Sequence, residues 1–156
     1  MRKTHYRDYA TEAFRFLARE GSSQAYKNRI WNEALARAAE RQAGGGGISA
    51  PTEAAITRAE KALKEAEAAI LDLEAAEFAL YAVSGDFAYG SEMRRAVQMV
   101  YMDRPDCPLV KGEIHGRVVL AANLIGAEER TIYRWLAKAR DIFAEKRGLR
   151  IDADIA

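Results

Sequence analysis

Apolar residues recur at helical spacing through the first part of the chain. In residues 5–20 they lie three or four positions apart, and Gly21 follows as a stop. A second run extends to about Gln42, and Ser22 or Ser23 can cap its first turn. The apolar positions of the two runs are Tyr6, Tyr9, Ala13, Phe16 and Leu17, followed by Tyr26, Ile30, Ala34 and Leu35. The pattern predicts an N-terminal helical hairpin over residues 1–42.

A glycine-rich stretch separates this hairpin from the next element. Residues 43–50 contain four consecutive glycines, which lose so much conformational freedom on ordering that they cannot hold a helix or a strand. We expect a flexible linker there. Pro51 suits a first helical turn, and almost no helix breaker follows as far as Val83. The segment 51–90 is therefore predicted to consist mainly of one long helix.

The long segment also has a heptad pattern. One set of apolar positions lies seven apart, and a second set is offset from it, as in the core positions of a coiled coil. The two sets are Ile56, Leu63 and Ile70, and Ala59, Ala66, Leu73 and Leu80. The pattern weakens at Glu77, which occupies the next position of the first set. Such a stripe can pack inside the chain or against a second copy, and both possibilities stay open.

The C-terminal third, residues 91–151, predicts short helices around a glycine. Residues 84–91 break the pattern, a short apolar-faced helix follows, and residues 103–108 form a loop. Two helices, 114–125 and 128–146, then flank Gly126. The sequence RVVLAANLIG is also rich enough in β-branched residues for a strand, but Ile132 to Phe143 keep a helical period and no partner strand is visible. The expected fold class is all-α, with an acidic tail over residues 152–156.

The helices around Gly126 have the residue types of a DNA-binding helix-turn-helix. That structure packs two short helices steeply across a tight turn, which favours glycine, with a small residue one turn earlier and apolar residues on the inner face of the second helix. The residues expected at these core positions are Ala122, Ile125, Gly126, Ile132 and Trp135. The alternative is an ordinary amphipathic helix pair with solvated charges.

The outer face of the second helix is predicted to be basic. At 100° per residue, Arg130, Arg134 and Lys138 point away from the apolar face, and Tyr133 lies at its edge. Arginine can pair with guanine edges or with phosphates, and Thr131 can contact phosphate or a thymine methyl. Glu129 lies in the first turn, where the helix dipole favours an acidic side chain.

Charge is unevenly distributed along the chain. Residues 1–42 hold 9 basic and 5 acidic side chains, residues 43–90 hold 3 and 8, and residues 91–151 hold 12 and 8. An anionic partner is therefore expected to meet the two ends. No apolar run approaches the roughly 20 residues that span a bilayer, and the lone Cys107 excludes an internal disulfide. These features predict a cytoplasmic protein that does not bind membranes.

Catalytic and metal-binding patterns are not evident in the sequence. A zinc site needs several ligands at workable spacing, and the only histidines are His5 and His115, with Cys107 as the single cysteine. The stretch AGGGGIS lacks the lysine of a phosphate-binding loop. We expect neither an enzyme nor a cofactor, and His115 is interpreted as a helix-surface residue or a phosphate contact.

The C-terminal part resembles a known DNA-binding fold. MRRAVQMVY, a loop, and the helix pair that ends in TIYRWLAKARDIFAEKRG resemble region 4 of bacterial sigma factors. Together with PTEAAITRAE and ILDLEAAEFAL, the arrangement over residues 51–150 resembles phage late-gene transcription activators of the RinA/ArpU type. This resemblance implies binding to promoter or operator DNA. The matching recognition residues would be Glu129, Arg130, Thr131, Tyr133 and Arg134.

The sequence therefore predicts a sequence-specific transcription regulator, encoded by a phage or prophage, that binds double-stranded DNA with helix 128–146. The N-terminal region and the long helix would form a homodimer or contact RNA polymerase. Two other functions are compatible with the pattern. A phage small terminase subunit also combines a helix-turn-helix with helical oligomerisation, and a helical adaptor would use the heptad stripe without binding DNA.

Overall fold

A computed structural model of the protein describes residues 2–41 and 52–149. No strand occurs in these residues, so the predicted all-α fold class is confirmed. The elements are α1 (Arg2–Glu20), α2 (Ser23–Arg41), α3 (Glu53–Glu65), α4 (Glu67–Ser84), α5 (Gly90–Val97), a π-helical turn η1 (Gln98–Met102), α6 (Glu113–Ile125) and α7 (Glu129–Arg147). The expected linker over residues 43–50 and the tail over residues 152–156 lie outside the described residues.

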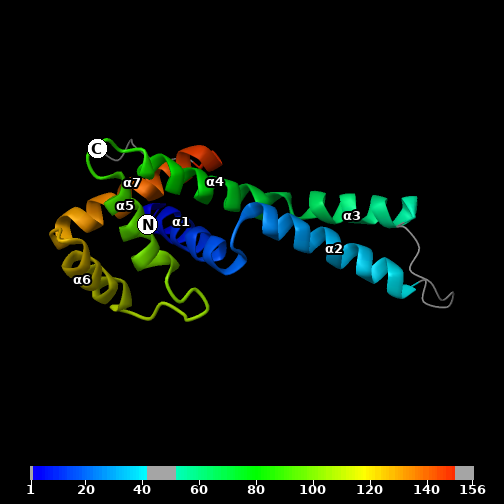
Figure 1. Ribbon diagram of the computed structural model, residues 1–156, viewed down its shortest axis with the longest axis horizontal. Helices are drawn as coiled ribbons and strands as arrows, with labels where there is room; N and C mark the ends of the chain where they lie inside the picture. The colour runs from blue at the N-terminus through cyan, green and yellow to red at the C-terminus, as the bar shows by residue number, and fades with distance from the viewer. Residues whose placement is uncertain (1, 42–51, 150–156) are drawn as a thin grey trace.

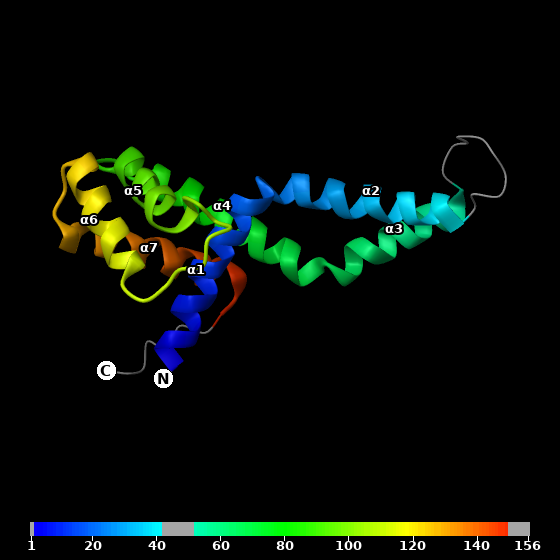
Figure 2. The ribbon, with the colours of Figure 1, turned by 90° about the horizontal axis from the view of Figure 1, so that it is seen from below.

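The helices form a body and an arm (Figure 1). The body consists of α1, α4, α5, η1, α6 and α7, and the arm consists of α2 and α3, which project from it side by side (Figures 1 and 2). In the predicted N-terminal hairpin, the two helices contact each other, but each contacts other elements more extensively. Both of its helices are present, but α2 packs along α3, whereas α1 packs against α4, η1 and α7. The periodicity predicts an apolar face on each helix but does not indicate which other helix that face meets.

The core of the body joins distant parts of the chain. The ring of Phe14, on α1, lies 5.9 Å from the ring of Tyr101 in η1 and 6.1 Å from that of Phe143 on α7. All three side chains are almost completely buried. Around them pack further fully buried residues of α4, α5 and α7, including Leu73, Val83, Val97, Ile132 and Leu136. Helix α1 is thus part of the same core as the predicted helix-turn-helix.

Small residues fill the contact between the two helices of the arm. The buried positions there are Ala34 and Ala38 on α2, and Ala55 and Ala59 on α3. Alanine lets two helices approach closely but removes little apolar area from water, so each contact contributes little stability. Thr52 caps α3, because its side-chain oxygen accepts a hydrogen bond from the backbone N–H of Ala55 at 3.2 Å.

The predicted long helix is bent at Ala66, which separates α3 from α4. The Ala66 N–H is shared between the carbonyls of Ala62 and Leu63, at 3.1 and 3.2 Å. Sharp bends usually occur at proline, glycine or a bulge, and none of these is present at this position. The cause is tertiary: α3 follows α2 along the arm, whereas α4 is held in the body by α1 and α7.

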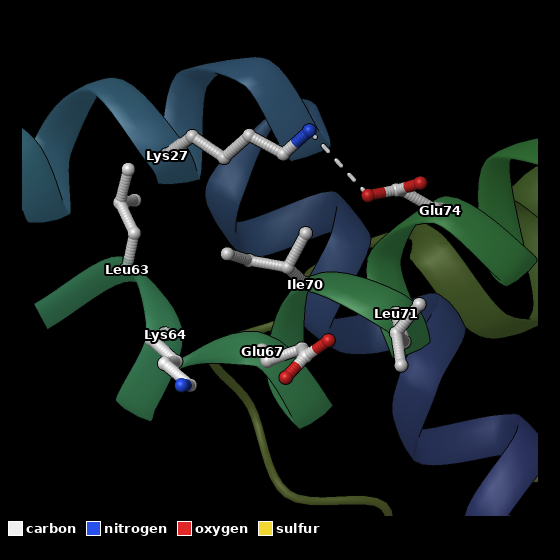
Figure 3. A pocket seen from close by; sticks show the side chains of 7 residues that line it. All are labelled: Lys27, Leu63, Lys64, Glu67, Ile70, Leu71 and Glu74. Carbon is white, nitrogen blue, oxygen red and sulfur yellow. Dashed lines mark ion pairs between the residues drawn. The ribbon is translucent and has the colours of Figure 1, made fainter. Parts of the chain in front are cut away.

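A hollow with a volume of about 430 Å³ lies at this bend (Figure 3). Leu63 and Ile70 face it from the two sides of Ala66, and the Lys27 ammonium lies 3.4 Å from a Glu74 carboxylate oxygen across its edge. Glu77 accepts a hydrogen bond from the Ser23 N–H at 3.1 Å, at the N-terminus of α2. A carboxylate is favourable there, which explains why a glutamate interrupts the heptad pattern.

The heptad stripe is used largely within the chain. Leu73 is fully buried, and Ile70 and Leu80 are 8% and 7% exposed, in contact with other helices of the same molecule. Ala59 is covered by α2 in the arm. Ile56, by contrast, remains 36% exposed. Of the two possibilities left by the sequence, packing inside the chain is therefore the one that these side chains adopt.

Candidate nucleic-acid interface

A three-residue turn joins α6 to α7. Gly126 ends α6 in the left-handed conformation, with φ at +83°. Its N–H and the N–H of Ala127 both donate to the Ala122 carbonyl, at 2.9 and 3.1 Å. Glu128 returns to extended backbone, and its carbonyl accepts the Ile132 N–H at 3.1 Å, which begins α7. A residue with a Cβ atom is strained in the left-handed region, so this turn requires glycine.

The inner face of α7 follows the predicted pattern. Ile132, Leu136, Ala139 and Phe143 have no exposed surface. Trp135 is half-buried, and its ring lies 5.8 Å from that of Tyr89, next to α5. On the preceding helix, Ala122 is buried and Ile125 is half-buried against the same core. The residues expected in the core of a helix-turn-helix thus lie in the core, and Gly126 lies at the exposed turn.

The outer face of α7 carries the predicted recognition residues. Of these six residues, Thr131 is half-buried. The exposed ones are Glu129, Arg130, Tyr133, Arg134 and Lys138. Arg130 and Arg134 are one helical turn apart. Within residues 2–41 and 52–149, neither guanidinium group takes part in an ion pair or a side-chain hydrogen bond, so both are free to meet an external anion.

His115 connects α6 to two of these residues. Its Nδ1 lies 2.9 Å from the Tyr133 hydroxyl, and the two rings are nearly parallel with centroids 6.3 Å apart. Its Nε2 lies 4.0 Å from a Glu129 carboxylate oxygen. The sequence predicted a surface position for His115, which is confirmed by its exposed side chain, but not these contacts. His115 therefore orients Tyr133 on the outer face.

The loop between α4 and α5 also contacts this face. The Lys138 ammonium lies 3.5 Å from an Asp86 carboxylate oxygen, so part of its charge is already compensated. The backbone N–H of Tyr89, and then that of Ala88, donate to Asp86 and lower the pKa of its carboxyl. The loop closes tightly, because a Cβ on Gly90 would lie 2.2 Å from the Ser84 carbonyl oxygen. The sequence predicts this segment only as a break between helices.

Two buried arginines hold the loop that follows η1. Arg15, on α1, donates to the Tyr101 carbonyl at 3.2 Å, to the Pro105 carbonyl at 3.1 Å, and to the Cys107 carbonyl. Arg117, on α6, donates to the Asp103 carbonyl at 2.6 Å and to a neighbouring carboxylate of its own helix. Burial, followed by repulsion from Arg117, lowers the pKa of Arg15. The loop before α6 is thus held by arginines of α1 and of α6 itself.

The described residues contain no group of three or more histidine, cysteine, aspartate or glutamate side chains that could hold a metal ion. Cys107 is exposed and is not in a disulfide. None of the described helices combines the length and the apolar character needed to cross a bilayer.

Comparison with known protein families, with curated proteins and with solved structures finds no match to this chain. Relatives therefore add no evidence for or against the resemblance to phage activators. A function must be inferred from the geometry of α6, α7 and the elements around them.

Proposed function

We propose that the protein is a sequence-specific DNA-binding transcription regulator that places the start of α7 in the major groove. The observation that carries the proposal is the pair Arg130 and Arg134, which are exposed and unpaired within the described residues. They lie in the first turns of a helix that follows a glycine turn, which is the part of a recognition helix that meets base edges. Arginine at such a position contacts guanine or phosphate.

The neighbouring side chains suggest a division of roles. Tyr133, oriented by His115, and Thr131 would contact the backbone or a thymine methyl. Lys138 would contact phosphate, although Asp86 competes for its charge. Glu129 lies at the positive end of α7 and beside His115, so we propose that it stabilises the helix terminus rather than contacting DNA. The resemblance to phage activators supports a phage or prophage origin and RNA polymerase as a further partner.

A second candidate is a helical interaction module, which an exposed apolar face on α4 favours. Leu71, Phe78 and Tyr81 are 42%, 43% and 77% exposed on that helix. The same face is also available to RNA polymerase if the protein is a regulator. Salt dependence separates the two functions, since only DNA binding releases condensed counterions.

The experiment first selects, from a pool of randomised duplexes, the sequences that the protein binds. The affinity for the selected duplexes is then measured by fluorescence anisotropy at two salt concentrations. The wild-type protein is expected to enrich a defined sequence. The double variant R130A/R134A should lose that binding and still fold, as judged by circular dichroism. The matched control is R37A/R58A, which removes two exposed arginines from the arm. Equal binding by wild type and R130A/R134A would refute the proposal.

Mass in solution distinguishes a regulator from a terminase subunit. A monomer or homodimer agrees with the regulator, and a ring of many copies would favour DNA packaging. Because the heptad stripe is buried within the chain, a homodimer would have to use another surface, such as the exposed face of α4.

A further inference from the structure

A second cavity, with a volume of about 410 Å³, lies between α1, the loop before α6, and α7. We propose that it binds a small organic anion, in which a carboxylate or phosphate is attached to an apolar group, and that Arg140 pairs with the anionic group. The volume falls within the range of small-molecule sites, which are mostly apolar with a few well-placed polar groups.

The central observation is a buried charge that lacks a charged partner. Arg140 is 9% exposed and lines the cavity. Its Nη1 donates to the Tyr101 hydroxyl at 2.6 Å, and within the described residues this is its only hydrogen bond. A guanidinium group has five N–H donors, and burying its charge without a counter-charge is costly. An anion in the cavity would remove that cost.

The other two buried arginines make more hydrogen bonds than Arg140 does. Arg15 donates to several backbone carbonyls, and Arg117 donates to carbonyls and to the Glu113 carboxylate. Arg117 Nε is the only fully enclosed side-chain nitrogen or oxygen without a hydrogen bond among the described residues. The unbonded nitrogens of Arg140 are therefore not fully enclosed, and the residue lines the cavity.

The remaining walls fit an anion with an apolar part. The Tyr101 hydroxyl accepts a hydrogen bond from Arg140, so its own proton can be donated to a ligand oxygen. The apolar lining residues are Leu109, Ile114, Leu136 and Ala137.

Two basic and two acidic side chains line the cavity, and pairing of one acidic side chain outside the cavity leaves positive charge in excess. Arg7 adds a second positive charge and Asp8 a negative one. Glu12 also lines the cavity, but it is paired with Arg19 at 2.8 Å. The uncompensated charge of the lining is therefore positive, which favours an anion over a cation.

Binding is tested by calorimetric titration of the full chain with phenyl phosphate and with phenylacetate, which carry the two possible anionic groups on the same ring. Benzyl alcohol is the neutral control, and inorganic phosphate tests the anion alone. We expect saturable binding of at least one phenyl anion and none of benzyl alcohol. Arg140→Gln should weaken binding by about tenfold to a hundredfold, the size expected for a charge-assisted hydrogen bond.

A second variant keeps the test valid if Arg140→Gln does not fold. Ala137→Phe should fill the cavity and abolish binding with every charge retained, whereas Arg37→Ala in the arm should bind the anion like wild type. Absence of binding to both phenyl anions, or equal affinity in wild type and A137F, would overturn the proposal.

Tyr133, Leu136 and Ala137 place one wall of the cavity on α7. An effect of the ligand on DNA affinity would follow from this, but that effect rests on the proposed function. Repeating the DNA titration with the bound anion present tests it. Anion binding without any DNA binding would leave the cavity proposal intact and refute only the proposed function.

Discussion

Arg15 donates a hydrogen bond to the backbone carbonyl of Tyr101, 86 residues away along the chain, at 3.2 Å. Three further carbonyls of the following loop, those of Arg104, Pro105 and Cys107, accept from the same guanidinium group. Through this one side chain, the N-terminal helix determines where η1 ends and where the approach to α6 begins. Helix α6, and with it the turn to α7, is therefore positioned in part by a residue far away in the sequence.

Replacing Arg15 with methionine should lower the free energy of unfolding by about 2–4 kcal/mol, because carbonyls of a part-buried loop lose their donors. Urea denaturation followed by circular dichroism measures this change. Arg19→Met is the matched control, since Arg19 donates to the same Pro105 carbonyl but its side chain is 33% exposed. Its cost should stay below about 1 kcal/mol. Equal costs for the two variants would contradict the role given to Arg15.

Two glycines of α6 and its turn should respond oppositely to alanine. Gly126→Ala should destabilise the protein by about 1–2 kcal/mol, since the residue has φ at +83°. Gly116→Ala should stabilise it by about 0.5–1 kcal/mol, because Gly116 is inside the helix and a Cβ there meets nothing within 4 Å. Thermal unfolding of both variants tests the pair. A stabilising Gly126→Ala would show that the turn is not built as described.

We expect the free energy of unfolding to depend on pH through the hydroxyl of Tyr9. Its hydroxyl donates to an Asp72 oxygen at 2.6 Å, and burial, followed by that bond, raises the pKa of Tyr9. Because the pKa is higher in the folded state, the stabilisation is complete below the ordinary value of about 10 and is lost as pH rises through the folded value. Tyr9→Phe should cost about 0.5–1 kcal/mol at neutral pH.

Melting temperatures between about pH 8 and pH 11 test this. The wild type should lose its advantage over Y9F as the pH rises, and parallel curves would exclude Tyr9 as the titrating group. Arg147 donates to the same Asp72 oxygen at 2.6 Å and is unchanged in Y9F, so the variant removes only one of the two bonds.

If the protein binds DNA as proposed, Asp86→Asn should raise its affinity. The change frees Lys138 from its counter-charge, while the amide oxygen can still accept from Ala88 and Tyr89. One more phosphate contact should steepen the dependence of log K on log salt by about 0.9. Glu145→Gln makes the same change in net charge at the exposed far end of α7 and should have little effect. Identical salt slopes for D86N and wild type would exclude a phosphate contact by Lys138.

Local periodicity was sufficient to predict most helices and the two faces of α7. Ile132, Leu136 and Phe143 recur at the spacing of one buried stripe, and Arg130 and Arg134 lie opposite them. The glycine turn was predictable because few other residues adopt its backbone conformation.

The bend at Ala66 and the partner of α1 were not predictable in this way. Alanine is the strongest helix former, so no local signal marks a bend that packing imposes. The burial of Arg140, by contrast, is indicated by its spacing in the sequence. It lies four positions after Leu136 and eight after Ile132, in register with the apolar stripe, where a charged residue indicates either a partner or a cavity.

The contact between Phe14 and Phe143 determines when the protein can fold during its synthesis. The core of the body is incomplete until α7 has left the ribosome, so the apolar face of α1 stays uncovered until residues up to Phe143 have been synthesised. Helices α2 and α3 of the arm are neighbours in the sequence, so they can pack together before α7 has been synthesised. Contacts of such large sequence separation slow folding. A chain that stops before α7 would hence carry a formed arm and an exposed, aggregation-prone remainder.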